Sequence, residues 1–213
     1  MLEVLNASKI LKANGNLMKV LFMAGSSRKE SLNKKLAHAA SDLARSAGAD
    51  VTFIDLADFP MPIYNGDLED DSGLPENALA LKKIFTEQDA LFIATPEYNG
   101  SFPALLKNTL DWLSRSHYEG EPRMSAYTNK VVALAAASPG GFGGMRSLMA
   151  LRLQMAHLNT LVISQQMALA KAGDAFDEEG SFKDDKKRAQ LDALVKTLMA
   201  TTRALAQDDT RAN

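Results

Sequence analysis

An apolar run, a polar loop and the start of a helical pattern follow one another in Val20-Leu21-Phe22-Met23-Ala24-Gly25-Ser26-Ser27-Arg28-Lys29-Glu30-Ser31-Leu32-Asn33. The helical pattern begins at Leu32. The order strand, loop, helix is typical of the first unit of a parallel α/β sheet. A helix N-terminus carries unpaired N–H groups and about half a positive charge, and nearby hydroxyl and guanidinium groups can complete a phosphate site. The loop is therefore a candidate phosphate cradle. The alternative is a simple helix cap, because serine and asparagine also cap helices that bind nothing.

The composition limits the function classes. The chain has 213 residues, of which 46% are hydrophobic, so it can bury a full core as one domain. Its formal net charge of -2 provides no basic field for nucleic acid or an anionic membrane, and we expect neither partner. The sequence shows no apolar run of about eighteen residues and no leader pattern, so we expect a cytoplasmic protein.

Cysteine is absent from the sequence, and the three histidines have no spacing that suggests a metal site. The lack of cysteine excludes disulfides, thiolate metal sites and cysteine nucleophiles. Any redox chemistry must therefore use a bound cofactor. We expect His38 and His157 to be solvated or satisfied by a helix dipole, while His117 and Tyr118 are candidates for the mouth of a substrate site.

Hydrophobic periodicity predicts five strands that alternate with five helices. The predicted strands are 19–24, 51–54, 90–94, 131–137 and 160–164, and the predicted helices begin near residues 32, 75, 104, 145 and 184. This alternation is typical of a three-layer α/β sandwich with a parallel sheet. We expect an N-terminal extension (1–17), one domain (18–207) and a C-terminal tail (208–213). Residues 55–74 are interpreted as a long functional or mobile loop, and the acidic run 69–71 as solvated surface.

Two further polar loops follow predicted strands. They read Thr95-Pro96-Glu97-Tyr98-Asn99-Gly100-Ser101 and Ser138-Pro139-Gly140-Gly141-Phe142-Gly143-Gly144. In open parallel sheets, ligands bind beyond the carboxyl ends of the strands, near a switch in strand order. We therefore expect these two loops and the loop at 25–33 to form one site. The alternatives are an ordinary capped loop for the first and a bare glycine-rich turn for the second.

In this order and spacing, the motifs 26–33, 96–101 and 138–144 resemble the NAD(P)H-dependent FMN reductase family, which includes quinone, azo and chromate reductases. The helix segment 103–115 is also similar, and the resemblance extends over about 19–206. It implies a flavodoxin-like fold whose five-stranded parallel sheet has the order 2-1-3-4-5. It also implies one bound FMN per subunit and assembly as a homodimer or homotetramer.

The resemblance implies a role for each loop. The FMN phosphate would lie on the first loop, the edge of the isoalloxazine ring on the second, and its pyrimidine side on the third. The implied cofactor-binding residues are Ser26, Arg28, Ser31, Leu32, Asn33, Pro96, Glu97, Tyr98, Asn99, Gly100, Ser138, Gly140, Gly141 and Phe142. Because the cofactor carries the chemistry, no catalytic side chain is expected.

The expected function is an FMN-dependent oxidoreductase that passes hydride from NADPH or NADH through bound FMN to a quinone or another small acceptor. One alternative is a flavodoxin-like electron carrier or redox sensor that binds FMN without NAD(P)H turnover, although such carriers tend to be more acidic than this chain. Another is a scaffold that has lost FMN. The helix at 145–157 is apolar around much of its circumference, which indicates either deep burial or, as the resemblance favours, a subunit interface.

Overall fold

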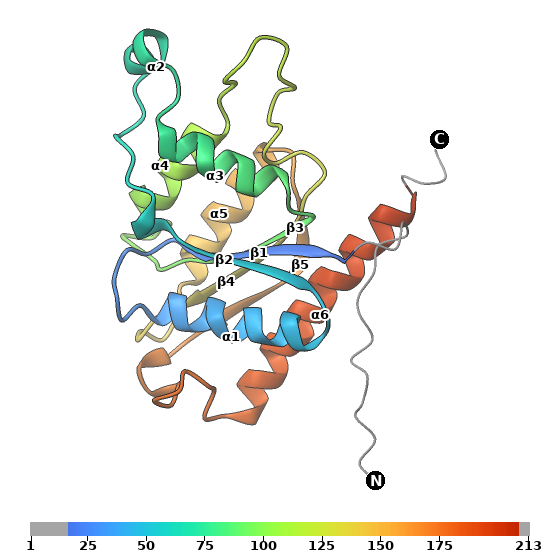
Figure 1. Ribbon diagram of the computed structural model, residues 1–213. Coiled ribbons are helices and arrows are strands. Elements are labelled where there is room, and N and C mark those ends of the chain that lie inside the picture. The colour runs from blue at the N-terminus through green and yellow to red at the C-terminus, as the bar shows by residue number, and fades with distance from the viewer. Residues whose placement is uncertain (1–16, 209–213) are drawn as a thin grey trace.

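The five strands form one parallel sheet. The computed structural model describes residues 17–208, so the predicted tail beyond Asp208 and all but the last residue of the predicted extension lie outside the described residues. The strands are β1 (Lys19–Ala24), β2 (Asp50–Asp55), β3 (Ala90–Ala94), β4 (Val131–Ala137) and β5 (Leu161–Leu169). They pair in the order β2-β1-β3-β4-β5, which confirms the predicted order 2-1-3-4-5 (Figure 1).

Helices cover both faces of this sheet (Figure 1). The helices α1 (Leu32–Ser46) and α6 (Asp185–Asp208) lie on one face, and α3 (Glu76–Thr86), α4 (Ala104–Leu113) and α5 (Met145–His157) lie on the other. Side chains alternate across the sheet, so Phe22 and Phe92 stack in the core beneath α1 and α6, at 5.4 Å between ring centroids. Because both faces are covered, β1, β3 and β4 are almost wholly buried and read as continuous apolar runs.

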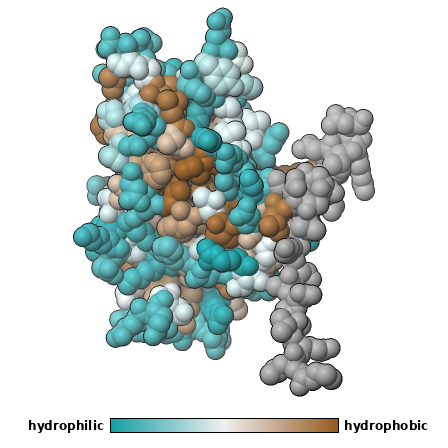
Figure 2. All heavy atoms as spheres, viewed as in Figure 1, coloured by the Kyte–Doolittle hydropathy of each residue, from teal (hydrophilic) through white to brown (hydrophobic). Residues whose placement is uncertain are grey.

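The edge strands are less buried than the three central ones. In Figure 2, hydrophobic residues gather midway up the face toward the viewer, between hydrophilic residues of the outer layers.

The edge strand β5 is longer than predicted. It continues to Leu169, whereas the prediction ends this strand at Ser164. The pairing register shifts between Val132 and Leu134 of β4, and the added part of β5 contains Gln165 and Gln166. Polar residues on an edge strand hide the apolar pattern that the prediction used.

The segment 55–74 is more ordered than its composition indicated. It contains a 3-10 turn, Leu56–Asp58, and a short helix, α2 (Gly66–Ser72), whose N-cap Asn65 accepts a hydrogen bond from the Asp67 N–H at 2.9 Å. The carbonyl of Pro62 accepts hydrogen bonds from Asn108 Nδ2 and Trp112 Nε1 of α4, both at 2.8 Å. The prediction of a long loop is therefore wrong for α2, which projects from the top of the molecule in Figure 1.

The acidic run at 69–71 is only partly solvated. The Glu69 side chain is mostly buried, and its carboxylate accepts hydrogen bonds from Arg115 Nε at 2.8 Å and from the Tyr64 hydroxyl at 2.9 Å. The hydrogen bond to Glu69 is the main reason that the pKa of the Tyr64 hydroxyl lies above its usual value of 10.0, and burial adds to this effect. The interpretation as solvated surface is therefore wrong for Glu69, which fastens α2 to the segment after α4.

Candidate functional site

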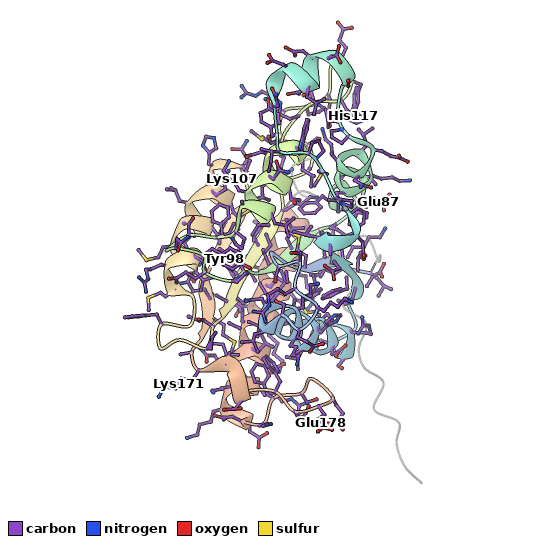
Figure 3. The ribbon with its side chains drawn as sticks, turned by 90° about the vertical axis from the view of Figure 1, so that its left-hand side faces the viewer. Glu87, Tyr98, Lys107, His117, Lys171 and Glu178 are labelled. Atoms are coloured by element: carbon purple, nitrogen blue, oxygen red, sulfur yellow. The ribbon has the colours of Figure 1, made fainter. Side chains whose placement is uncertain are left out.

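The three predicted loops meet at one end of the sheet. The strands that precede them, β1, β3 and β4, are neighbours, and hydrogen bonds continue the sheet past their ends. Gly25 N–H donates to the Ala94 carbonyl at 2.8 Å, and Thr95 N–H donates to the Ala135 carbonyl at 2.9 Å. Figure 3 looks onto this end, with Tyr98 of the second loop near the middle of the view. The structure therefore brings together the loops that the strand order predicted to be adjacent.

The first loop contains two buried hydroxyl groups and one exposed guanidinium. Ser31 is the N-cap of α1, and its Oγ accepts a hydrogen bond from Lys34 N–H at 3.4 Å. Ser26 Oγ accepts from Arg28 N–H at the same distance. Each hydroxyl still has its own hydrogen to donate. Among residues 17–208, the exposed Arg28 side chain has no ion-pair partner. This donor set suits a phosphate dianion.

Asn33 and Leu32 lie in the first turn of α1, but their side chains face the protein. The amide of Asn33 donates from Nδ2 to the Ala137 carbonyl at 2.9 Å and accepts from the Ala137 N–H at 2.8 Å. The Asn33 side chain thus ties the first loop to the strand that leads into the third loop. It has one remaining Nδ2 hydrogen for the predicted bond to phosphate. Leu32 packs against the core, so its backbone N–H is the group that could face a ligand.

The second loop is a tight turn. Tyr98 N–H donates to the Ser101 carbonyl at 2.8 Å, and Ser101 N–H donates back to Tyr98 at 3.1 Å. Between them, Asn99 and Gly100 have positive φ angles of 52° and 82°, which a type I′ turn requires and which asparagine and glycine tolerate best. The turn leaves the Tyr98 ring about half exposed at the site, just beyond the partly buried Pro96.

Glu97 is engaged by a residue that the sequence analysis did not single out. Its carboxylate contacts Arg146 Nε at 3.0 Å and accepts a hydrogen bond from Arg146 N–H at 3.2 Å. Arg146 lies in the first turn of α5, whose N-cap Gly144 has no side chain to cap the helix. Glu97 therefore supplies that cap from the second loop. No motif links positions 97 and 146, so only the three-dimensional fold identifies the pair.

The third loop is pinned at its base and exposed at its tip. Ser138 Oγ accepts from Gly140 N–H at 3.1 Å, and the Gly140 carbonyl accepts from Lys171 N–H at 3.1 Å. Gly143 has a φ of 62°, and a Cβ there would lie 2.7 Å from main-chain atoms of Ala168, so only glycine fits. At the tip, next to the exposed Gly141, the Phe142 ring lies 5.0 Å from the Arg146 guanidinium.

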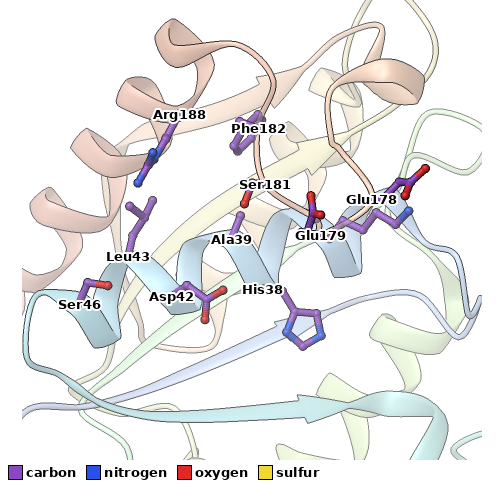
Figure 4. A pocket seen from close by; sticks show the side chains of 12 residues that line it. His38, Ala39, Asp42, Leu43, Ser46, Glu178, Glu179, Ser181, Phe182 and Arg188 are labelled. Carbon is purple, nitrogen blue, oxygen red and sulfur yellow. The ribbon is translucent and has the colours of Figure 1, made fainter.

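Another cavity lies away from these loops. It has a volume of about 410 Å³ and is formed by α1 and the segment before α6, including His38, Glu179 and Phe182 (Figure 4). None of the predicted site residues lines it. Its lining mixes acidic, basic and apolar side chains without a convergent set of donors. The three loops, where the predicted residues converge, therefore remain the candidate functional site.

His117 and Tyr118 belong to a separate cluster. His117 Nδ1 lies 3.0 Å from a carboxylate oxygen of Glu121, which also forms an ion pair with Lys82 at 2.6 Å. This cluster lines a cavity of about 440 Å³ beside α3. His117 is far above Tyr98 in Figure 3, so the structure does not place His117 at the mouth of the three-loop site.

The fold and the site together define a class of protein. A parallel sheet of order 2-1-3-4-5, with a phosphate-type cradle after β1 and two further loops at the same end, is the flavodoxin-like arrangement. The family model described as NADPH-dependent FMN reductase matches residues 18–174, and the chain belongs to that family. It is thus an oxidoreductase of the NAD(P)H-dependent reductase type. Within residues 17–208, no helix is long and apolar enough to cross a membrane.

Individual relatives agree with this assignment. The chain is 35% identical over 177 residues to a quinone reductase of Pseudomonas putida, which covers 83% of this chain and 90% of that protein. It is 33% identical over 187 residues to a 2-hydroxy-1,4-benzoquinone reductase of Burkholderia sp, covering 87% and 97%. Among solved structures, the flavoenzyme NAD(P)H:(acceptor) oxidoreductase FerB from Paracoccus denitrificans superposes with a TM-score of 0.74 at 31% identity, covering 88% and 98%.

Proposed function

We propose that this protein is an FMN-dependent quinone reductase of the cytoplasm. The overall reaction would take a hydride from NADPH or NADH and a proton from solvent, and deliver both to a quinone to give the hydroquinone and NAD(P)⁺. The observation that carries this proposal is the convergence of a phosphate-type cradle and two exposed aromatic side chains, Tyr98 and Phe142, at one end of the sheet. The names of the relatives at 33% and 35% identity support a quinone as the acceptor class.

The residues of the first loop fit the phosphate end of FMN. The hydroxyls of Ser26 and Ser31 and the guanidinium of Arg28 would donate to the phosphate oxygens, together with N–H groups at the start of α1. The positive end of α1 adds to the attraction for a dianion. Asn33 would act mainly through Ala137, by holding the cradle at a fixed position relative to the third loop.

The other two loops would orient the flavin ring. The backbone of Pro96, Asn99 and Gly100 would face its N5 and carbonyl edge, and the backbone of Ser138, Gly140 and Gly141 its pyrimidine side. Main-chain N–H groups of these loops would stabilise negative charge on the flavin ring. When bound, FMN would supply the hydride-accepting and electron-donating chemistry. The protein would bind both substrates in turn at the mouth beside Tyr98 and exclude water from it.

A spectroscopic experiment tests this proposal. The purified protein is titrated with FMN, and its visible spectrum is recorded before and after anaerobic addition of NADPH or NADH, then after addition of 1,4-naphthoquinone. We expect a yellow complex that is bleached by the nucleotide and recovers its colour with the quinone. A yellow complex that the nucleotide does not bleach would indicate the carrier or sensor function. A protein that never binds FMN would contradict both.

We further propose that α5 mediates a homodimer, which could pair again into a homotetramer. Its inner face is buried, whereas Met149 and Leu153 on its outer face are 64% and 75% exposed. Two large apolar side chains one turn apart on a helix surface favour burial against a second copy. We expect the double substitution Met149→Glu and Leu153→Glu to give monomers in analytical ultracentrifugation. Leu79→Glu, at an exposed apolar position on α3, is the matched control and should leave the mass unchanged.

A further inference from the structure

Phe142 presents a large apolar ring to solvent at the tip of the third loop. The side chain is 66% exposed, although an aromatic ring of this size normally contributes to a core. The Arg146 guanidinium lies 5.0 Å from the ring centroid, within the range of a cation–π contact. An exposed ring next to a fixed cation has a preferred orientation that a free phenylalanine on a loop would lack.

Arg146 is itself held by the second loop. Its side chain is 60% exposed, but its partner Glu97 is only 16% exposed and contacts both the Nε and the backbone N–H of Arg146. Because the Glu97 carboxylate contacts both the Nε and the backbone N–H of Arg146, it fixes the position of the guanidinium group. A chain of contacts therefore runs from Glu97 through Arg146 to Phe142, and it couples the second loop to the tip of the third.

The contact chain leaves one face of the ring for a ligand. An aromatic ring has two faces, and a single guanidinium covers only one of them. Planar ligands stack on an aromatic face with a gain of about 0.5 to 1.5 kcal/mol beyond area burial. We propose that Phe142 is the stacking wall that selects flat, aromatic acceptors, and that Glu97 and Arg146 are positioning residues that set the orientation of its ring. This inference rests on the proposed quinone reductase function and names the specificity determinant of that site.

A double-mutant cycle with two acceptors tests the inference. The variants are Phe142→Ala, Arg146→Ala and the combination, with Leu205→Ala on α6 as a matched exposed apolar control. The acceptors are 1,4-naphthoquinone, which can stack, and ferricyanide, which cannot. We expect Phe142→Ala to raise the KM for naphthoquinone about 10-fold. The KM for ferricyanide should stay within about 2-fold of wild type.

The second arm separates positioning from a structural role. Arg146→Ala should raise the KM for naphthoquinone about 3-fold in the wild-type background and have no further effect when Phe142 is already alanine, because coupled residues are not additive. Arg146→Lys should recover part of the effect, since lysine keeps the charge but lacks the planar fork. Glu97→Gln should act in the same direction as Arg146→Ala, by loosening the guanidinium.

Several outcomes would overturn the inference. Additive effects of the two substitutions, or an unchanged KM for naphthoquinone in Phe142→Ala, would do so. A weaker Kd for FMN in that variant would mean that the ring contacts the cofactor, and a loss of the oligomer would mean that it belongs to an interface. Failure of the proposed function has a different signature, because the wild-type protein would then show no bleaching of bound FMN by NADPH or NADH.

Discussion

The Asn33 side chain makes both hydrogen bonds that the main chain of Ala137 can offer, one as donor at 2.9 Å and one as acceptor at 2.8 Å. The two residues are 104 positions apart, and both are buried. Asn33 is the second residue of α1, the helix that follows the candidate phosphate cradle, whereas Ala137 ends the strand that leads to the third loop. One side chain therefore sets the spacing between the two ends of the candidate cofactor site.

Loss of this tie should be costly. Asn33→Leu keeps the size of the side chain but leaves the Ala137 N–H and carbonyl buried without partners, at about 1 to 3 kcal/mol each. We expect the free energy of unfolding to fall by about 2 to 4 kcal/mol, measured by urea denaturation. Ser27→Ala, in the same loop and exposed, is the control. A loss for Asn33→Leu as small as that of the control would show that the pair contributes nothing.

Arg28 should act on affinity and not on stability. Its side chain is exposed and contacts no described acidic group, so Arg28→Ala should leave urea unfolding unchanged. Hydrogen bonds to a charged partner contribute about 1.5 to 3 kcal/mol, so the Kd for FMN should rise roughly 10- to 100-fold. The Kd can be measured by the quenching of FMN fluorescence on binding. Lys29→Ala removes a neighbouring exposed charge and should change the Kd much less. Equal effects of the two substitutions would point to a general electrostatic field and against a direct bond.

Local sequence was sufficient for most of the fold. The predicted bounds of β1 (Lys19–Ala24), β4 (Val131–Ala137) and α5 (Met145–His157) match the structure. Apolar patterns end at Gly25 after β1 and at Ser138 after β4, and Gly144 marks the start of α5. The helix α2 was missed because it has no apolar stripe. Glu69 holds α2 in place through its contacts with Arg115 and Tyr64. Arg115 is distant in the sequence, and Tyr64 belongs to no recognisable motif.

The candidate site could be located from the sequence, but its internal contacts could not. Parallel strand order alone predicts that the loops after β1, β3 and β4 are neighbours, whichever residues they contain. By contrast, the hydrogen bonds of Asn33 with Ala137 and of Glu97 with Arg146 depend on side-chain directions in the folded chain. The resemblance implies that Glu97 belongs to the cofactor site, but the contact of its carboxylate with Arg146 of α5 could not be predicted from the sequence.

The buried ion pair of Lys82 and Glu121 should make a large contribution to stability. The side chains are 5% and 3% exposed, and Glu121 also accepts hydrogen bonds from Ser125 Oγ and the His117 N–H. Lys82→Met would leave the carboxylate buried without its counter-ion, so we expect a loss of about 3 to 5 kcal/mol in urea unfolding at pH 7. Lys83→Met, at the adjacent exposed lysine, is the control. Equal urea midpoints of unfolding for Lys82→Met and Lys83→Met would contradict the prediction.

The same pair predicts an acid transition. Burial opposes ionisation of Glu121, but hydrogen bonds from Lys82, Ser125 and the backbone of His117 outweigh it and lower its pKa from 4.5 to about 2. A depressed carboxyl pKa gives stability that is present above pH 4.5 and is lost as the pH falls toward 2. Glu121→Gln should flatten the pH dependence of unfolding in that window. An unchanged slope would mean that other carboxyl groups govern it.

His38 predicts a second, milder pH dependence. Its ring stacks on Phe53 at 3.7 Å between centroids, and desolvation by burial lowers its pKa below 6.5 despite the nearby Asp42 and Asp55. The unfolded state then binds a proton more readily than the native state, so stability falls as the pH drops through 6.5. In thermal unfolding between pH 7.5 and 5.5, His38→Phe should keep the stacking and lose part of this slope. His157→Phe is the matched control, and an equal change in both would contradict the assignment.

The three site loops all follow the central strands, whose residues are almost wholly buried, yet the aromatic side chains of the second and third loops, Tyr98 and Phe142, are exposed. Substitutions at Tyr98 or Phe142 therefore disturb no core contact, while those at Asn33 or Gly143 do. Under the proposed function, such a division would allow the preference for an electron acceptor to change while the cofactor site is kept. A saturation library at the tip positions should yield folded, flavin-loaded variants with new acceptors far more often than one at the base positions.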